Sequence, residues 1–482
     1  MSGLAAAIKI GENQNSGTNN NDDGNRQQHV ILLEASPTVG GRVQSDKTDD
    51  GYILDRGFAV FLEEYPNSQR LMDYDALDLC PFDPGALVKL PNKAGLSRVA
   101  DPLRQPKRLW DAATSPVGSV KDKARLVPLL VHVMAKSVDE LFDEDETDTL
   151  TCLKERWKFS ESFINGFLAP FLEGIYLTPL NQQSSRMFHF VFKMFSIGNV
   201  SLPRGGIGAV SEQLAAKAES LGVDIRTNFA VDRIRVEKEE EGFTITTLGG
   251  RTIHADKIVL ATDVKSATRI VSSMEGCDEI VDIDEDFIER SVGCLYYSFE
   301  SESPLHEPIL VLNGVEERGT RDSPINNACF PSVVCGDYSP NGSNLCSVSI
   351  LENVLAEFDG KDDELDIAVR KQLSGWFPSH AKSILDPQKW KLEKIYRIRG
   401  AQPAQYGCSY PAKCKWRQRR IYVSRSEVTA RHVCSGRPYF YFLAEWGTWE
   451  RDCCRGSGVR SKKMTQCTTN VCRQYPMNQT YR

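Results

Sequence analysis

The residues best suited to chemistry in this chain lie close together, between residues 30 and 42. Glu34 ends an apolar run, and Gly40, Gly41 and Arg42 follow shortly after it. A carboxylate at the end of a strand accepts hydrogen bonds from ribose hydroxyls, paired glycines let the backbone approach a phosphate, and arginine pairs with phosphate charge. We interpret the segment as a dinucleotide-binding site; the alternative is an ordinary turn followed by a surface arginine.

Such a site needs a helix whose N-terminus faces the phosphates and a strand that ends in the acid. The small-residue run at residues 2–10 predicts the helix, and the apolar run at residues 29–33 predicts a buried strand. Gly3 stands where the last glycine of a G-x-G-x-x-G fingerprint should be. Between helix and strand, residues 11–28 are rich in Asn, Gly and Asp, which predicts a disordered surface loop.

With these motifs the chain resembles the flavin-containing amine oxidase superfamily, which includes monoamine oxidases, protoporphyrinogen oxidase and phytoene-desaturase-like enzymes. The likeness rests on ILLEASPTVGGRV, YILDRGFAVFLEEYP, SSRMFHFVFKMFS, LPRGGIGAV and KIVLATD. It covers about residues 1–405 apart from the Asn-rich loop. It implies FAD as the cofactor and an α/β fold, in which a discontinuous Rossmann-like FAD-binding domain carries an α+β substrate domain.

The resemblance also implies positions along the cofactor. Glu34 would hold the adenosine ribose, Arg42 would lie at the pyrophosphate, and the backbone of Val231 would contact adenine. The segment from Asp55 to Phe58 would pass near the ribityl chain or the flavin ring. A core strand residue is an equal alternative for Val231, and an ordinary helix-start loop is the alternative for Gly205 and Gly206. The expected FAD-binding residues are Ser2, Gly3, Glu34, Ala35, Gly40, Gly41, Arg42, Arg56, Gly57, Phe58, Pro203, Arg204, Gly205, Gly206, Val231, Ala261 and Thr262.

The nucleotide-binding elements lie at both ends of the first half of the chain. We therefore predict an FAD-binding domain from residues 1–62 and 200–263, without its first strand, and a substrate domain from residues 64–199 and 264–400. Periodicity predicts helices at residues 67–74, 120–138, 160–167, 182–195, 208–221 and 363–376. It predicts strands at residues 223–225, 231–236, 243–247, 257–261, 294–299, 345–350 and 390–398.

No catalytic residue is assigned, because hydride transfer to a flavin depends mainly on positioning and on a cavity without water. The aromatic helix at residues 182–195 could wall an apolar substrate pocket, although a core helix is the favoured interpretation. His189 on this helix is interpreted as structural. Lys193 could serve as a base, but a solvated lysine is favoured.

Composition limits the remaining possibilities. The chain has 482 residues, 41% of them hydrophobic, which is typical of a soluble globular protein of two or three domains, and we predict no transmembrane helix. Residues 408–482 hold 15 Lys and Arg against 4 Asp and Glu, and the rest of the chain holds 43 against 61. An acidic body argues against nucleic-acid binding; the basic tail is what would support it. Seven scattered cysteines before residue 408 indicate reduced, buried thiols in an intracellular protein, and we predict no metal site.

Both ends of the chain depart from the family pattern. The first strand of the fingerprint would precede Met1, so we interpret the chain as starting inside the first glycine turn, and cytoplasm or plastid both stay open as locations. After Gln405 the sequence becomes basic and rich in Cys and Trp, where the family has a G-D motif. A one-base frame shift over residues 412–461 can restore such a motif, so we hypothesise that residues 407–482 are a non-native tail, which sequencing the transcript would test. We expect the chain as written to bind FAD poorly.

The leading functional prediction is an FAD-dependent oxidoreductase that takes hydride from an amine or from an apolar C–C substrate. The alternatives are a non-catalytic flavin-binding protein and a nucleic-acid binder that uses the basic tail. We predict a small-molecule substrate, apolar or an amine, and no nucleic acid. The sequence leaves open the electron acceptor, the oligomeric state and covalent attachment of FAD.

Overall fold

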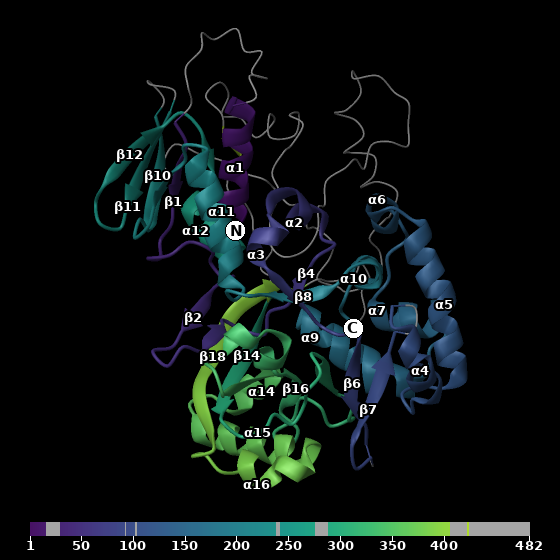
Figure 1. The fold of residues 1–482 in the computed structure, drawn as a ribbon. Coiled ribbons are helices and arrows are strands. Elements are labelled where there is room, and N and C mark those ends of the chain that lie inside the picture. Colours follow the sequence, from purple (N-terminus) through teal and green to yellow (C-terminus); the bar gives the residue numbers. More distant parts are fainter. Residues whose placement is uncertain are drawn as a thin grey trace, which may run out of the picture.

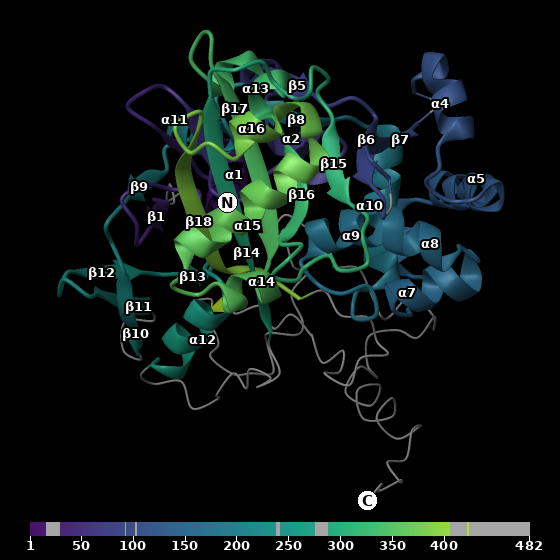
Figure 2. The ribbon, with the colours of Figure 1, turned by 90° about the horizontal axis from the view of Figure 1, so that it is seen from below.

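A computed structural model of the chain describes residues 1–15, 29–91, 93–101, 104–237, 242–274, 288–404 and 422–423. Helices and sheets are mixed in three regions (Figure 1). One holds α1, α11, α12 and the strands β10 to β12, a second is a seven-stranded sheet with short helices on it, and a third is a helical region. The seven-stranded sheet and the helical region lie side by side when the molecule is turned by 90° (Figure 2).

The first region joins segments that are far apart in the sequence. β1 pairs in parallel with β9, with Ile31 opposite Asp224. Leu4 and Ile8 of α1, one helical turn apart, are buried against Leu214 of α11. The elements are α1 (Ser2–Asn15), β1 (Ile31–Leu33), α11 (Gly208–Ser220) and β9 (Asp224–Arg226).

The loop predicted from residue 11 is wrong in its first part, because residues 11–15 continue α1. Gly11 explains the continuation. A Cβ on Gly11 would come within 2.9 Å of the Leu221 Cβ, so the glycine lets this turn of α1 pack closely on the end of α11. Contact with a neighbouring helix thus overrides the poor helix propensity of the segment. Residues 16–28 of the predicted loop lie outside the described residues.

A small antiparallel sheet follows β9, in the order β10-β11-β12. Ile270 and Val271 of α12 are buried with Ile234 and Phe243 of this sheet, so α12 packs on it although it follows residue 263. β13 pairs antiparallel with β19. The elements are β10 (Val231–Glu237), β11 (Gly242–Thr247), β12 (Thr252–Ala255), β13 (Ile258–Val259), α12 (Val264–Ser272) and β19 (Tyr422–Val423).

Short strands lie between the first region and the large sheet. β8 is the middle strand of a three-stranded sheet and pairs with β4 and β5, which places Ser201 opposite Phe61 and Pro203 opposite Leu79. β2 and β3 form a separate hairpin. The elements are β2 (Ser45–Lys47), β3 (Ile53–Asp55), β4 (Phe61–Leu62), α2 (Pro66–Leu71), α3 (Tyr74–Leu77), β5 (Leu79–Pro81) and β8 (Val200–Pro203).

The large sheet has the strand order β18-β14-β17-β16-β15-β6-β7. Its pairs are antiparallel apart from β15 with β6. Apolar residues of α15, such as Leu365, Val369 and Leu373, are fully buried with side chains of β14 and β17. Its strands are β6 (Gly85–Lys89), β7 (Leu96–Ala100), β14 (Glu289–Phe299), β15 (Leu310–Asn313), β16 (Ile325–Cys329), β17 (Asn344–Leu351) and β18 (Trp390–Pro403), and its helices are α13 (Pro331–Val334), η4 (Gly336–Tyr338), α14 (Glu352–Glu357), α15 (Asp362–Trp376), η5 (Pro378–His380) and α16 (Ala381–Ile384).

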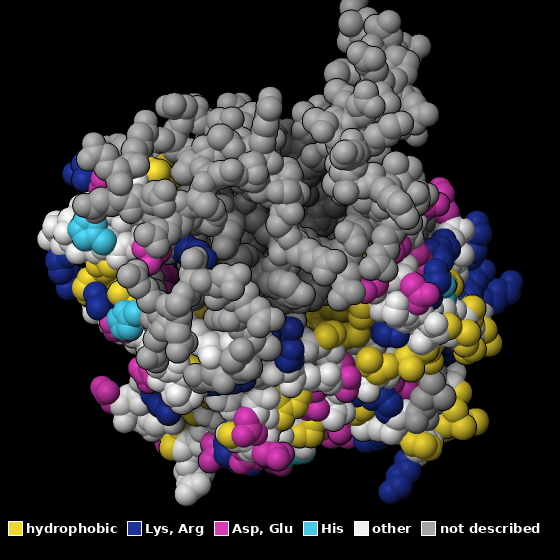
Figure 3. All heavy atoms as spheres, turned by 90° about the horizontal axis from the view of Figure 1, so that it is seen from above, with side chains coloured by type: hydrophobic (Ala, Val, Ile, Leu, Met, Phe, Trp, Pro, Cys, Tyr) yellow, Lys and Arg dark blue, Asp and Glu magenta, His cyan; other side chains and the backbone are white. Residues whose placement is uncertain are grey.

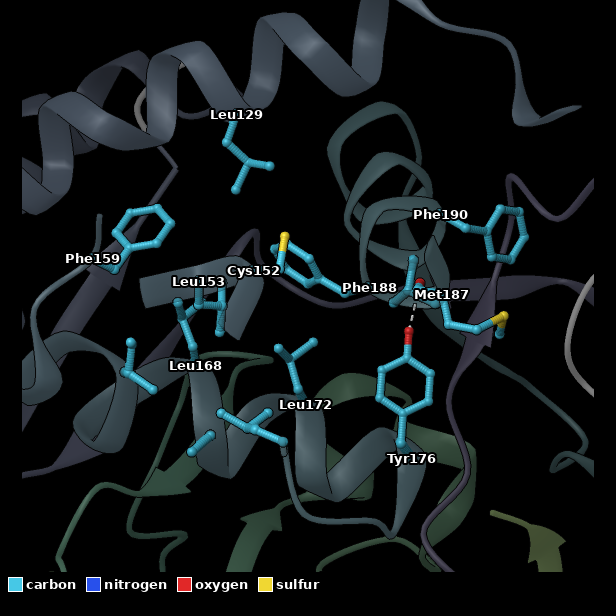
Figure 4. Close-up of a cluster of buried hydrophobic side chains, with 14 of the residues drawn as sticks. Leu129, Cys152, Leu153, Phe159, Leu168, Leu172, Tyr176, Met187, Phe188 and Phe190 are labelled. Carbon is cyan, nitrogen blue, oxygen red and sulfur yellow. Dashed lines mark hydrogen bonds between the residues drawn. The ribbon is translucent and has the colours of Figure 1, made fainter. Parts of the chain in front are cut away.

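The helical region is built around aromatic and aliphatic side chains (Figure 4). Leu129 of α5 points into this cluster, and the Tyr176 hydroxyl donates to the Met187 carbonyl oxygen at 2.7 Å, which joins α9 to α10. α10 is therefore a core helix, as favoured from the sequence. The elements are η1 (Pro106–Arg108), α4 (Leu109–Thr114), α5 (Val120–Ala135), α6 (Val138–Phe142), α7 (Thr149–Thr151), η2 (Cys152–Arg156), α8 (Glu161–Phe163), η3 (Ile164–Leu168), α9 (Ala169–Tyr176) and α10 (Ser185–Ile197).

Two further sequence predictions can be compared with the structure. Six of the seven cysteines before residue 408 are free and buried, and Cys277 lies outside the described residues. Within the described ranges, no helix combines the length and the apolar character needed to cross a membrane. Apart from Tyr422 and Val423, the predicted non-native tail lies outside the residues that the structure describes.

Candidate FAD site

The carboxylate at the end of β1 is held in place by its own turn. Glu34 Oε1 accepts hydrogen bonds from the backbone N–H and the hydroxyl of Ser36, both at 2.9 Å. The Glu34 N–H donates to the Arg226 carbonyl oxygen at 2.9 Å, so the parallel pairing of β1 and β9 continues to this residue. The carboxylate is half-buried, and Ala35 beside it is exposed. A carboxylate held in this way can accept hydrogen bonds from the hydroxyl groups of a ribose.

The glycine turn after Glu34 packs its backbone against α11. Gly40 is buried with φ +112°, and a Cβ there would meet the Ser211 Oγ at 2.6 Å. Gly41 is exposed with φ +62° and would meet nothing within 4 Å. The two glycines therefore differ. Gly40 is required because Ser211 lies too close for any side chain, whereas Gly41 is favoured only by its positive φ. Arg42 is exposed and donates from Nη1 to the Gly400 carbonyl oxygen at 2.7 Å.

The start of α1 lies beside β1 and the segment after β13. A Cβ on Gly3 would lie 3.6 Å from the Leu32 Cδ1 and 3.7 Å from the Ala261 Cβ. Ser2 and Gly3 are half-buried, and Thr262 is exposed next to Ala261. The structure thus brings together Gly3 and Ala261, which are separated by more than half of the chain.

Asp55, the first residue of the segment expected near the ribityl chain or flavin ring, is a buried carboxylate that ties this region to the loop before α11. Asp55 Oδ1 accepts from the Ser45 hydroxyl at 2.5 Å and from the Ile207 N–H at 2.9 Å, and Oδ2 accepts from the Tyr338 hydroxyl at 2.9 Å. Ser45 Oγ also accepts from the Gly208 N–H at 2.8 Å. Burial raises the pKa of the Asp55 carboxyl. An aspartate at the end of an apolar strand in YILDRG was the available signal; its partners are distant in sequence.

The residues after Asp55 are packed and paired. Arg56 forms an ion pair with Asp46, with 2.8 Å between Nη2 and Oδ1, and Asp46 is shared with Lys394. Gly57 is buried with φ +97°, and a Cβ there would meet the Ile398 Cδ1 at 2.8 Å. Phe58 is half-buried and packs against a buried hydrophobic cluster that includes Ile53 and Leu54 of β3. The structure therefore gives Arg56 a structural partner and leaves Gly57 as a point of close approach.

The second glycine-rich loop lies where β8 ends. Pro203 is its last strand residue, and Gly206 is buried with φ +88°, where a Cβ would meet the Ser45 Oγ at 2.5 Å. Gly205 is exposed. The Arg204 side chain forms ion pairs with Asp78 and Asp337. The Pro203–Gly206 loop is held against β2 and β3, because Ser45 and Asp55 accept hydrogen bonds from the backbone that directly follows it. Val231 is half-buried as the first residue of β10, opposite Thr247.

The two polar residues of α10 lie away from these loops. Lys193 donates from Nζ to the carbonyl oxygens of Val133, at 2.9 Å, and Lys136, at 2.7 Å. The favoured interpretation of a solvated lysine is therefore wrong, because α10 crosses the end of α5, where carbonyl groups lack helical partners. His189 is buried, accepts from the Trp157 indole N–H at 3.1 Å and has its pKa lowered by burial to about 3, in keeping with a structural role.

His189 belongs to a cluster that holds one possible set of metal ligands. Ligand atoms of His132, Glu144 and His189 lie within 4.8 Å of one another. Glu144 already forms ion pairs with Lys136, at 2.5 Å, and Arg156, at 2.8 Å. Burial opposes ionisation of Glu144, but these cations prevail and lower its pKa to about 2. Both oxygens of Glu144 are thus already paired with cations, so the arrangement is that of an ion-pair network.

The donor set around β1 fits FAD. An oriented carboxylate at a strand end, a helix start beside it and buried glycines at the Gly40 turn suit a ribose and a pyrophosphate. Residues 1–432 match the family model of the flavin containing amine oxidoreductases. The chain belongs to this family, and its cofactor is FAD. The match continues past Gln405, where the resemblance in the sequence was expected to end.

The relatives agree with this family. The chain is 30% identical over 167 residues to a carotenoid 3,4-desaturase of Haloarcula japonica, and the match covers 31% of this chain and 32%, about a third, of the relative. It has the fold of a protein proposed to be a protoporphyrinogen oxidase from Exiguobacterium sp. 255-15, with a TM-score of 0.58, 17% identity and coverage of 84% and 86% of the two chains. It has also the fold of a putrescine oxidase bound to putrescine, with a TM-score of 0.56, 17% identity and coverage of 84% and 86%.

Proposed function

We propose that this protein is an FAD-dependent oxidoreductase that removes hydride from an apolar C–C substrate. The observation that carries the proposal is the conjunction of the family match with an acid-ended strand and a buried glycine turn at Glu34 and Gly40. FAD when bound supplies the hydride acceptor, and the protein supplies orientation and exclusion of water. Residues 1–62 and 200–263 would form a Rossmann-like FAD-binding domain, with residues 64–199 and 264–400 as the substrate domain.

Each predicted residue would act through its observed surroundings. Glu34, fixed by Ser36, would accept ribose hydroxyls, and the backbone at Gly40 and Gly41 would approach the pyrophosphate. Arg42 would add positive charge at the phosphates, because its exposed side chain can leave the Gly400 carbonyl at little cost. Further proposed contacts are at Ser2, Gly3, Ala35, Gly57, Phe58, Pro203, Gly205, Gly206, Val231, Ala261 and Thr262. Arg56 and Arg204 are weaker candidates, since both are held in ion pairs.

The likeness to a carotenoid desaturase favours an apolar C–C substrate over an amine. The aromatic side chains of α10 give no support to this choice, because they fill a core. An amine substrate is the second candidate, supported by the family description alone.

The first experiment measures FAD binding by the full-length protein. Purified protein is incubated with FAD, freed of unbound flavin and analysed by its absorbance and by flavin released on denaturation. We expect Glu34→Ala to lower the affinity for FAD about tenfold to a hundredfold, since charge-assisted hydrogen bonds contribute about 1.5–3 kcal/mol. Glu212→Ala, an exposed glutamate on α11, is the matched control. Equal FAD affinity of the Glu34→Ala variant and the wild type would contradict the proposed ribose contact.

The second experiment tests the reaction. Flavin reduction is followed anaerobically by stopped-flow absorbance after mixing the FAD-loaded protein with a polyene in detergent or with a primary amine. Reduction by the polyene supports the proposal, and reduction by the amine alone shifts it to amine oxidation. Bound flavin that neither substrate class reduces would contradict it and favour a non-catalytic flavin-binding protein.

A further inference from the structure

Exposed apolar side chains are concentrated on α4 and α5. Among the described residues, eleven large hydrophobic side chains are exposed, and six of them belong to these two helices. Trp110 is 76% exposed and Val120 78%, values typical of polar surface residues. Figure 3 shows hydrophobic side chains gathered on this outer edge of the molecule, with basic and acidic side chains beside them. The six residues, here called the α4–α5 patch, are Leu109, Trp110, Val120, Val127, Val131 and Met134.

α5 has two apolar faces. Leu129 and Val133 are fully buried in the helical core, which accounts for one face. Val127 and Val131 lie one turn apart on the other face and are 60% and 62% exposed. The solvent face of a helix in a globular protein is ordinarily polar, and a contiguous exposed apolar patch marks an interaction site. Core packing therefore explains only half of the apolar residues of α5.

The surroundings of the patch favour a lipid surface as its occupant. Lys107 and Lys121 are exposed beside Trp110 and Val120. The acids of the two helices are removed from the surface or compensated, because Asp122 is buried and Asp111 is ion-paired with Arg108 at 3.2 Å. α4 and α5 lie together at the outer edge of the molecule in both ribbon views (Figures 1 and 2).

The chemistry of these residues matches the interface of a bilayer. Tryptophan has an apolar ring and a polar N–H, and it concentrates where lipid meets water. A helix with valines facing outward and exposed lysines close to them, here Lys121 on α5 and Lys107 before α4, can lie in the plane of an anionic membrane. α6, which follows α5, exposes Asp139 and Glu140, so these acids lie beyond the C-terminal end of the patch.

We propose that the α4–α5 patch docks this protein on the surface of an anionic membrane. Docking would place α4 and the outward face of α5 at the level of the headgroups, with the apolar side chains of the patch inserted between them. The proposal stands apart from the identity of the substrate, since it rests on the patch and its charges.

Vesicle flotation of the full-length protein tests the proposal. Vesicles of phosphatidylcholine with phosphatidylserine are compared with vesicles of phosphatidylcholine alone. We expect the wild type to float with the anionic vesicles, and the Trp110→Ser/Val127→Ser/Val131→Ser variant to bind at least about tenfold more weakly. The matched control is Leu248→Ser/Ile367→Ser, which changes two residues that are 68% and 66% exposed elsewhere. Trp110→Ser alone repeats the test should the triple variant be destabilised.

Charge and self-association complete the test. Lys107→Glu/Lys121→Glu should weaken flotation with anionic vesicles and leave the thermal midpoint unchanged. Failure of the wild type to float, or equal flotation of the patch variant and the control variant, overturns the proposal. A wild-type dimer in light scattering that the patch variant converts to a monomer also overturns it, because a second copy of the chain would then be the occupant.

Discussion

Removal of the Asp55 carboxylate should loosen the attachment between β3 and the loop before α11. In Asp55→Ala, three donors lose their acceptor: the buried Ile207 N–H, the Tyr338 hydroxyl and the half-buried Ser45 hydroxyl. An unsatisfied buried donor costs about 1–3 kcal/mol, so the two buried donors together give about 3 kcal/mol after some relief from the loss of a buried charge. The free energy of unfolding should fall by this amount, and FAD binding should weaken because the Gly206 turn is no longer held.

Asp55→Asn separates the hydrogen bonds from the charge. Its Oδ1 can still accept from the Ile207 N–H, and the Tyr338 hydroxyl can rotate to accept from the new amide. Burial raises the pKa of the Asp55 carboxyl, so a neutral amide also removes an unfavourable charge. We expect this variant to stay within about 1 kcal/mol of the wild type.

Urea unfolding followed by circular dichroism, at constant m-value, measures both variants. Asp49→Ala, in the exposed turn between β2 and β3, is the control and should change stability by less than about 0.5 kcal/mol. An Asp55→Ala protein as stable as this control would refute the assigned role. Equal losses in Asp55→Ala and Asp55→Asn would show that the charge, rather than the hydrogen bonds, is what matters.

Three other perturbations have defined outcomes. Gly40→Ala should lower stability by about 1–3 kcal/mol and reduce bound FAD, whereas Gly41→Ala, with strain but no clash, should cost about 1 kcal/mol; thermal melts and flavin content report both. The pKa of Glu144 is lowered to about 2 from its ordinary 4.5, so its ion pairs stabilise the fold fully above pH 4.5 and lose their effect as the pH falls towards 2. Glu144→Gln should therefore reduce the loss of the free energy of unfolding between pH 4.5 and pH 2. A loss equal to that of the wild type would count against the ion-pair network. Leu129→Ala should cost about 2–5 kcal/mol in urea unfolding, since the side chain is fully buried, and a loss below about 1 kcal/mol would contradict its place in the core.

The pattern of apolar residues along the sequence predicted many helices and strands. It failed where contacts between distant segments determine the local structure. The helices predicted at residues 120–138 and 182–195 are α5 and α10, because their apolar spacing is strong. The hairpin β6–β7 was not predicted, since its pairing with β15 involves residues that lie far along the chain. Residues 11–15 were expected to be a loop, and their helical form depends on the approach of α1 to Leu221.

The sequence by itself determined the motif from Glu34 to Arg42, the family resemblance and the FAD cofactor, because these depend on residue types at short spacing. The tertiary structure determined which hydrogen-bond or ion-pair partner each side chain has. It joined Asp55 to Tyr338, and it placed the Lys193 amine on the carbonyl groups at the end of α5. It also turned half the apolar residues of α5 outward. Hydrogen bonds, ion pairs and burial depend on distances between segments far apart in the chain, which local sequence does not encode.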